Sequence, residues 1–65
     1  MTLLLNGQPQ EVTAATLADA LAELGYAGKV VATAVNGDFV ASRLRETVQL
    51  AEGDRVEVLA PMQGG

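Results

Sequence analysis

RVEVLAPMQGG, residues 55–65, combines an alternating strand pattern with an unusual ending. Its first half alternates as a half-buried strand does. The alternation separates two faces, with Val56, Val58 and Ala60 on one and Arg55, Glu57 and Leu59 on the other. Pro61 carries no amide hydrogen, so regular sheet pairing should stop near it. We therefore expect one domain over residues 1–60 and a flexible C-terminal Gly-Gly tail over residues 61–65.

A first hairpin is expected at the other end of the chain. Residues 2–5 form a short apolar run that stops at Asn6-Gly7. Asn-Gly is a strong hairpin signal, because both central residues of a type I′ turn need a positive φ. The chain should return over residues 8–12 as an edge strand, since Pro9 removes an amide donor from the ladder.

One main helix is predicted between Thr16 and Leu24. Thr16 is a suitable N-cap, and Asp19 stands three residues later, a shortened variant of the capping box. One apolar stripe with helical spacing is formed by Leu17, Ala20, Leu21 and Leu24. Gly25 then provides the left-handed residue that ends the helix.

A second strand pair should follow the helix. Residues 29–35 are β-branched and apolar enough for a central strand buried on both faces. Asn36-Gly37 repeats the hairpin signal. Residues 39–41 should form the returning strand, and we expect Phe39 to lie in the core.

An irregular connection leads to the last strand. Residues 42–49 show no regular pattern and should run over the surface. Gly53-Asp54 predicts the turn that enters the last strand. The three arginines, Arg43, Arg45 and Arg55, are expected to be solvated.

These elements predict an α+β domain, with a mixed sheet of four to five strands and one main helix packed on one face. The compact solution places the first and last strands side by side in the middle of the sheet. This is the β-grasp, or ubiquitin-like, arrangement. The pattern alone does not fix that strand order.

Composition excludes most enzyme and nucleic-acid chemistry. The 65 residues include no Cys and no His, which removes thiol nucleophiles, Cys-ligated zinc and the commonest general base. The net charge is −4, and the only aromatic residues are Tyr26 and Phe39, which argues against nucleic-acid binding. We expect no bound metal, no bound cofactor and no enzymatic activity of the chain alone.

Membrane and export signals are also missing from the pattern. Residues 1–5 lack the cationic start and the long apolar run of a signal peptide. No segment approaches the roughly 20 apolar residues of a membrane helix. The expected location is the cytoplasm.

The candidate reacting group is the α-carboxylate of Gly65. Two glycines in the last two places should occur in roughly 0.5% of chains by chance. Gly64 and Gly65 could enter a channel too narrow for any Cβ atom. A terminal carboxylate is a poor electrophile and needs activation, most simply by ATP to an acyl-adenylate. Gly28-Lys29 lacks the rest of a phosphate-binding loop, so a partner enzyme must use the ATP.

The chain resembles the thiamine-pathway sulfur carriers (ThiS), which are ubiquitin-like β-grasp proteins, over essentially its whole length. The resemblance rests on Asn6-Gly7, Leu17 and Leu21, Val35-Asn36-Gly37, Gly53-Asp54 with Val56-Glu57-Val58, and Gln63-Gly64-Gly65. Family members often carry an aromatic residue in the segment corresponding to residues 43–45. This chain has Leu44 and Arg45 there, which leaves the partner contacts of that loop open.

The resemblance implies a role as a recyclable co-substrate. A ubiquitin-activating-type adenylyltransferase would adenylate Gly65. Sulfur from a donor linked to a cysteine desulfurase would then convert the carboxylate into a thiocarboxylate. Thiazole synthase would take that sulfur into the thiazole ring.

Candidate partner-binding residues are Leu59, Met62 and Gln63. Leu59 shares a strand face with Arg55 and Glu57, and an exposed apolar residue beside the tail would form a docking patch. Met62 suits such a patch because its side chain adapts to different surfaces.

Three alternatives remain at this point. A carrier of the same type could serve molybdopterin or cysteine synthesis. A ubiquitin-like modifier would be joined through Gly65 to a lysine of a target protein. A plain β-grasp interaction module would have an inert tail.

Overall fold

The first Asn-Gly pair forms the predicted hairpin in the computed structural model, which describes residues 1–60. β1 (Thr2–Leu5) pairs antiparallel with β2 (Gln8–Glu11). Asn6 and Gly7 connect the two strands with φ values of 50° and 84°, as a type I′ turn requires. Pro9 lies on β2, which is an edge strand of the sheet, so its missing amide hydrogen costs no inner ladder bond.

The helix forms where the sequence predicted it. α1 spans Leu17–Glu23, and the Thr16 side chain accepts a hydrogen bond of 3.2 Å from the Asp19 amide. Gly25 follows the helix with a φ of 93°. The predicted apolar stripe packs inward, since Leu17, Ala20 and Leu21 are buried and Leu24 packs against the core.

The second strand pair is shorter and more exposed than expected. β3 (Ala32–Val35) pairs antiparallel with β4 (Asp38–Val40) through the Asn36-Gly37 turn. The prediction of a strand over residues 29–35, buried on both faces, is wrong, because Val30 is 81% exposed. Two causes explain the difference. The neighbouring strand ends opposite Ala32, and only one face of the sheet is covered by the helix.

Phe39 does not lie in the core as predicted. Its side chain is 73% exposed, whereas the next residue, Val40, is 8% exposed. Neighbouring side chains on a strand point to opposite faces, so β4 can direct only one of the two inward. Val40 pairs with buried Thr33, and Phe39 therefore lies on the open face opposite Ala34.

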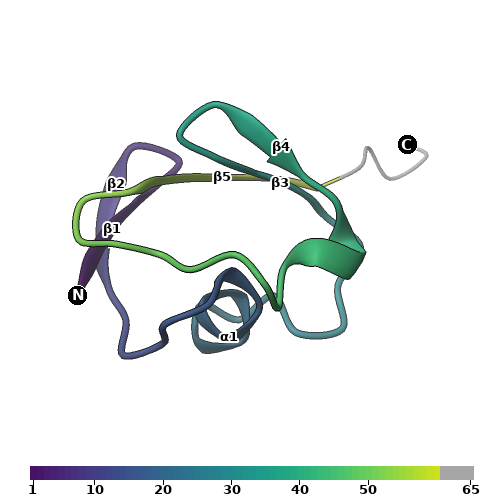
Figure 1. The fold of residues 1–65 in the computed structure, drawn as a ribbon, viewed down its shortest axis with the longest axis horizontal. Helices are drawn as coiled ribbons and strands as arrows, with labels where there is room; N and C mark the ends of the chain where they lie inside the picture. The colour runs from purple at the N-terminus through teal and green to yellow at the C-terminus, as the bar shows by residue number, and fades with distance from the viewer. Residues whose placement is uncertain (61–65) are drawn as a thin grey trace.

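The complete sheet has the order β2-β1-β5-β3-β4, with β5 (Arg55–Leu59) in the middle. β1 and β5 run parallel, with Leu4 opposite Arg55 and Leu5 opposite Val56. This confirms the predicted mixed sheet with its first and last strands side by side. Figure 1 shows α1 on one side of this sheet, and the end of β5 far from the N-terminus.

A single core lies between the helix and the covered face of the sheet. Its buried members are Leu3, Val12, Ala14, Leu17, Ala20, Leu21, Val40, Leu50, Val56 and Val58. On β5 the expected alternation is observed, because Val56 and Val58 are buried while Arg55, Glu57 and Leu59 are exposed.

The connection to β5 contains a short 3₁₀ helix, η1 (Ser42–Leu44), followed by Arg45. The expectation that Arg45 is solvated is wrong. Its Nε donates to the Thr33 hydroxyl at 3.0 Å, and its Nη2 donates to the Val31 carbonyl at 2.7 Å. The Thr33 hydroxyl in turn donates to the Val40 carbonyl at 2.9 Å. Arg45 therefore fastens the connection to the sheet.

A carboxylate at the end of α1 fixes the segment that enters the helix. The Glu23 carboxylate accepts hydrogen bonds of 2.8 Å from both the backbone amide and the hydroxyl of Thr13. These bonds stabilise the ionised form, and they lower the pKa of Glu23 below its ordinary value.

We predict that replacing Glu23 with glutamine lowers stability in neutral solution more than in acid. The folded-state pKa is depressed, so the carboxylate stabilises the fold above the unfolded pKa of about 4.3. That contribution is lost as pH falls through the lower folded value. Urea unfolding of both proteins across this range measures it, with Glu46→Gln as the control at another exposed acid. A stability difference that stays constant with pH would contradict the prediction.

Candidate functional site

The candidate site begins where β5 ends. Leu59 closes the strand, Ala60 follows it, and the described part of the chain stops there. Met62, Gln63, Gly64 and Gly65 lie outside the described residues. Their predicted roles in chemistry and partner binding therefore stay predictions.

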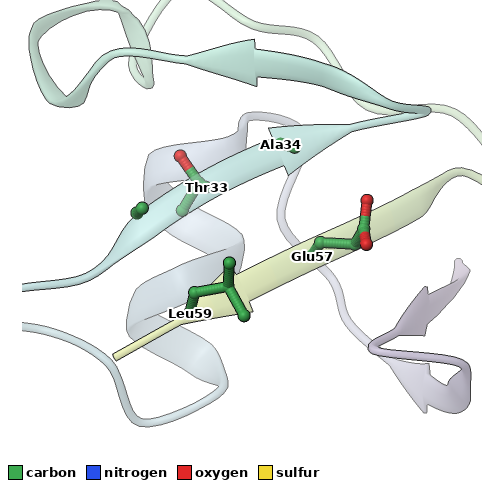
Figure 2. Close-up of a pocket in the computed structure, with 5 residues that line it drawn as sticks. Thr33, Ala34, Glu57 and Leu59 are labelled. Carbon is green, nitrogen blue, oxygen red and sulfur yellow. The ribbon is translucent and has the colours of Figure 1, made fainter. Parts of the chain in front are cut away.

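At the end of β5, the Leu59 side chain lies on the open face of the sheet, opposite the face that α1 covers. Leu59 is 70% exposed and pairs with Ala32, and Glu57 pairs with Ala34. Figure 2 shows Leu59 and Glu57 on β5 beside Thr33 and Ala34 on β3. The exposure predicted for Leu59 from strand alternation is confirmed.

An apolar surface surrounds this exit point. We call it the exit patch, and it consists of Val30, Ala32, Ala34, Phe39 and Leu59. A shallow hollow of about 320 Å³ is lined by Val30, Val31, Ala32, Leu59 and Ala60. A smaller hollow of about 110 Å³ adjoins it and is lined by Ala32, Thr33, Ala34, Glu57 and Leu59.

The sequence reasoning missed two members of the exit patch, Val30 and Phe39. For Phe39 the local pattern showed only that Phe39 and Val40, as neighbours on one strand, could not both face the core. For Val30 we find no local signal, since its exposure depends on where the ladder between β3 and β5 ends.

β5 carries two charged residues on the open face. Arg55 and Glu57 alternate with the buried valines and share the face with Leu59. The open face of β5 is therefore charged at Arg55 and Glu57 and becomes apolar at Leu59. The apolar end of this face is the exit patch, which includes Leu59, the last residue of β5.

Neither a metal site nor a membrane-spanning helix is found within residues 1–60. No group of three or more acidic, His or Cys side chains in this part is arranged to hold a metal ion. No helix in the same part has the length and apolar character needed to cross a membrane.

The fold and the site define the class of the protein. A five-stranded mixed sheet packs against one α-helix, and its central strand ends in an exposed apolar patch. This is a ubiquitin-like β-grasp protein.

Comparisons with known proteins place the chain within that class. The model of the ThiS family matches residues 3–65. The sulfur carrier protein ThiS of Thermus thermophilus is 39% identical over 61 residues, covering 94% of this chain and 95% of that protein. A crystal structure of the thiamine biosynthesis protein ThiS from Geobacter metallireducens superposes with a TM-score of 0.82, at 30% identity and with all of both chains covered. The solution structure of a thiamine biosynthesis protein from the same organism gives a TM-score of 0.78 at 30% identity, covering all of this chain and 88% of that chain.

The chain belongs to the ThiS family of sulfur carrier proteins in thiamine biosynthesis. The predicted family and β-grasp fold are thereby confirmed. As a member of this family, the chain is a carrier protein and not an enzyme.

Proposed function

We propose that the α-carboxylate of Gly65 is the group that carries sulfur, as a thiocarboxylate. The match to the family model extends to residue 65, which supports a role for this end of the chain. An unperturbed terminal carboxyl has a pKa of about 3.3–3.7 and is ionised at neutral pH, so it must be activated before a nucleophile can attack it. The two terminal glycines have no side chains to obstruct that approach.

The reaction has two balanced steps. The Gly65 carboxylate attacks the α-phosphorus of ATP, which forms the acyl-adenylate and releases pyrophosphate. A sulfide nucleophile then attacks the acyl carbon, the new C–S bond replaces the C–O bond, and AMP leaves. If the sulfur arrives as a persulfide linked to a cysteine desulfurase, a thiol must also cleave the remaining S–S bond.

The carrier supplies only the acyl group and a docking surface. A ubiquitin-activating-type adenylyltransferase binds and uses the ATP, and the chain itself binds no cofactor or metal. Thiazole synthase then accepts the sulfur for the thiazole ring. We place these steps in the cytoplasm.

The observation that carries the proposal is the exposed exit patch at the end of β5. Leu59, Phe39 and Val30 are each at least 70% exposed, which is unusual for large apolar side chains gathered at one place. A partner that covers this patch would hold the C-terminal segment close to its own active site. Met62 and Gln63 would continue the contact along the tail.

The direct test is the intact mass of the protein after incubation with the candidate adenylyltransferase, ATP and a sulfide source. We expect the mass gain of sulfur replacing oxygen, confined to the C-terminal peptide and trapped by alkylation. Alkylation matters because oxidation of Met1 or Met62 adds nearly the same mass. An unmodified protein would favour the inert module, and an adenylate that reacts only with lysine would favour the modifier.

A further inference from the structure

The side chain of Asn6 binds the strand that carries the tail. Its Oδ1 accepts a hydrogen bond of 2.9 Å from the Val58 amide, and its Nδ2 donates one of 3.2 Å to the Val58 carbonyl. Asn6 and Val58 are 52 positions apart in the sequence. The Asn-Gly pair therefore does more than form a turn.

The geometry of the parallel ladder explains these bonds. The Leu4 amide donates to the Asp54 carbonyl and the Asn6 amide to the Val56 carbonyl, each at 2.9 Å. The next bond in this series would join the Val58 carbonyl to an amide two residues beyond Asn6. The chain has turned away by then, since Gln8 already pairs back with Leu5. The Asn6 carboxamide takes the place of the missing backbone groups.

Asn36 makes a related contact at the opposite end of β5, although its Nδ2 donates to the Asp54 carboxylate at 3.1 Å and not to a strand carbonyl. Its Oδ1 accepts from the Arg55 amide at 2.9 Å, and its own amide donates to the Arg55 carbonyl at 2.7 Å. Both asparagines have φ values near 50°, and both precede a glycine. Asn36 holds the start of β5, whereas Asn6 holds Val58, which immediately precedes Leu59.

We propose that Asn6 is a positioning residue for the terminal carboxylate. Val58 is 6% exposed, so its amide and carbonyl need partners inside the protein. Without the carboxamide, β5 would lose its last hydrogen bonds to the β1 side, and the end of the strand would become more mobile. Leu59 would then be held less firmly in the exit patch. The segment between the last hydrogen-bonded residue of β5 and Gly65 would become longer. This inference rests on the proposed function.

The test compares Asn6→Gly with Asn36→Gly as its matched control. Glycine adopts the positive φ of either turn, so each variant keeps its hairpin and loses only the carboxamide. We expect the Val58 amide to exchange its hydrogen about ten times faster in Asn6→Gly than in Asn36→Gly. We also expect Asn6→Gly to lower kcat/KM for adenylation several-fold relative to Asn36→Gly, measured as ATP-dependent pyrophosphate release with the partner enzyme.

Asn6→Asp provides a second, more conservative variant. Its carboxylate can still accept from the Val58 amide but cannot donate to the Val58 carbonyl. We expect its exchange at Val58 to lie between those of the wild type and Asn6→Gly. This variant keeps the test available if the glycine variant folds poorly.

The two proposals fail in different ways. Equal kcat/KM in Asn6→Gly and Asn36→Gly would overturn the positioning role of Asn6, and equal Val58 exchange would overturn its hold on β5. An unmodified wild-type protein in the adenylation assay would overturn the proposed function instead. Hydrogen exchange of the Val58 amide is measured on this chain alone. It therefore shows whether Asn6 holds β5 even if the adenylation assay fails.

Discussion

Adding one alanine after Gly65 is expected to abolish sulfur loading and to leave the folded domain unchanged. The extra residue moves the terminal carboxylate by about 3.5 Å from the position that the adenylating centre would hold. A misplacement of about 1 Å can cost about 100-fold in rate, so we expect at least that loss. Residues 1–60, which contain the entire described core, are not altered.

Two measurements and one control make this prediction specific. Intact mass after the loading reaction reports the thiocarboxylate, and thermal unfolding reports the domain. Extension by one glycine instead of alanine separates the change in length from the bulk of a methyl group. Normal loading of both extended proteins would contradict the proposed reaction and favour an inert tail, whereas normal loading of only the glycine form would assign the effect to bulk.

Much of the fold could be predicted because its signals are local. The two Asn-Gly turns require positive φ, and the structure gives φ values of 50° and 51° to their asparagines. The helix follows from the Thr16 cap, the apolar stripe and Gly25, all within ten residues. In each case the residues that cause the structure are neighbours in the sequence.

The errors concern features that depend on distant parts of the chain. Whether Phe39 is buried depends on which face of the sheet the helix covers. The end of β3 depends on where β5 stops, opposite Ala32. Arg45 donates to Thr33 on β3 and to the Val31 carbonyl just before that strand, both more than ten residues away in the sequence. Local patterns carry no information about such contacts.

The residues of the candidate site also fall into two groups, those that a local pattern predicts and those that depend on the sheet topology. The exposure of Leu59 followed from strand alternation alone, and the structure confirms it. Val30 and Phe39 join Leu59 only because the sheet topology brings β3, β4 and β5 together. The hydrogen bonds of Asn6 to Val58 were not expected, since a residue that explains a turn gives no sign of a second role.

Replacing Leu59 with serine is expected to weaken binding to the adenylyltransferase strongly while the fold is retained. A buried apolar anchor at the centre of an interface typically contributes 2 kcal/mol or more, so the KM for the carrier should rise by about 30-fold. The kcat at saturation should change little, because the tail and its carboxylate are unaltered. Stability should change by about 0.5 kcal/mol or less, because the side chain is 70% exposed in the free protein.

Leu44→Ser is the matched control for Leu59→Ser. Leu44 is also an exposed leucine, at 45%, but it lies on η1 and outside the exit patch. The two variants remove the same side chain and add the same hydroxyl, so general effects on solubility and hydration are shared. We expect the KM of Leu44→Ser to stay within about twofold of the wild type, because most surface substitutions outside an interface centre change binding little.

Phe39→Ser tests whether the exit patch acts as one surface. Phe39 lies opposite Ala34, which lines the smaller hollow together with Leu59. If a single partner surface covers both side chains, the double variant should lose less binding free energy than the sum of the two single losses, because contacting residues are not independent. If the losses of binding free energy are strictly additive, Phe39 and Leu59 contact the partner separately. If KM rises equally in Leu59→Ser and Leu44→Ser, the exit patch is not the docking surface. A rise in KM confined to the Leu59 and Phe39 variants would mean that the partner recognises the exit patch on β4 and β5, so that docking itself delivers the carboxylate.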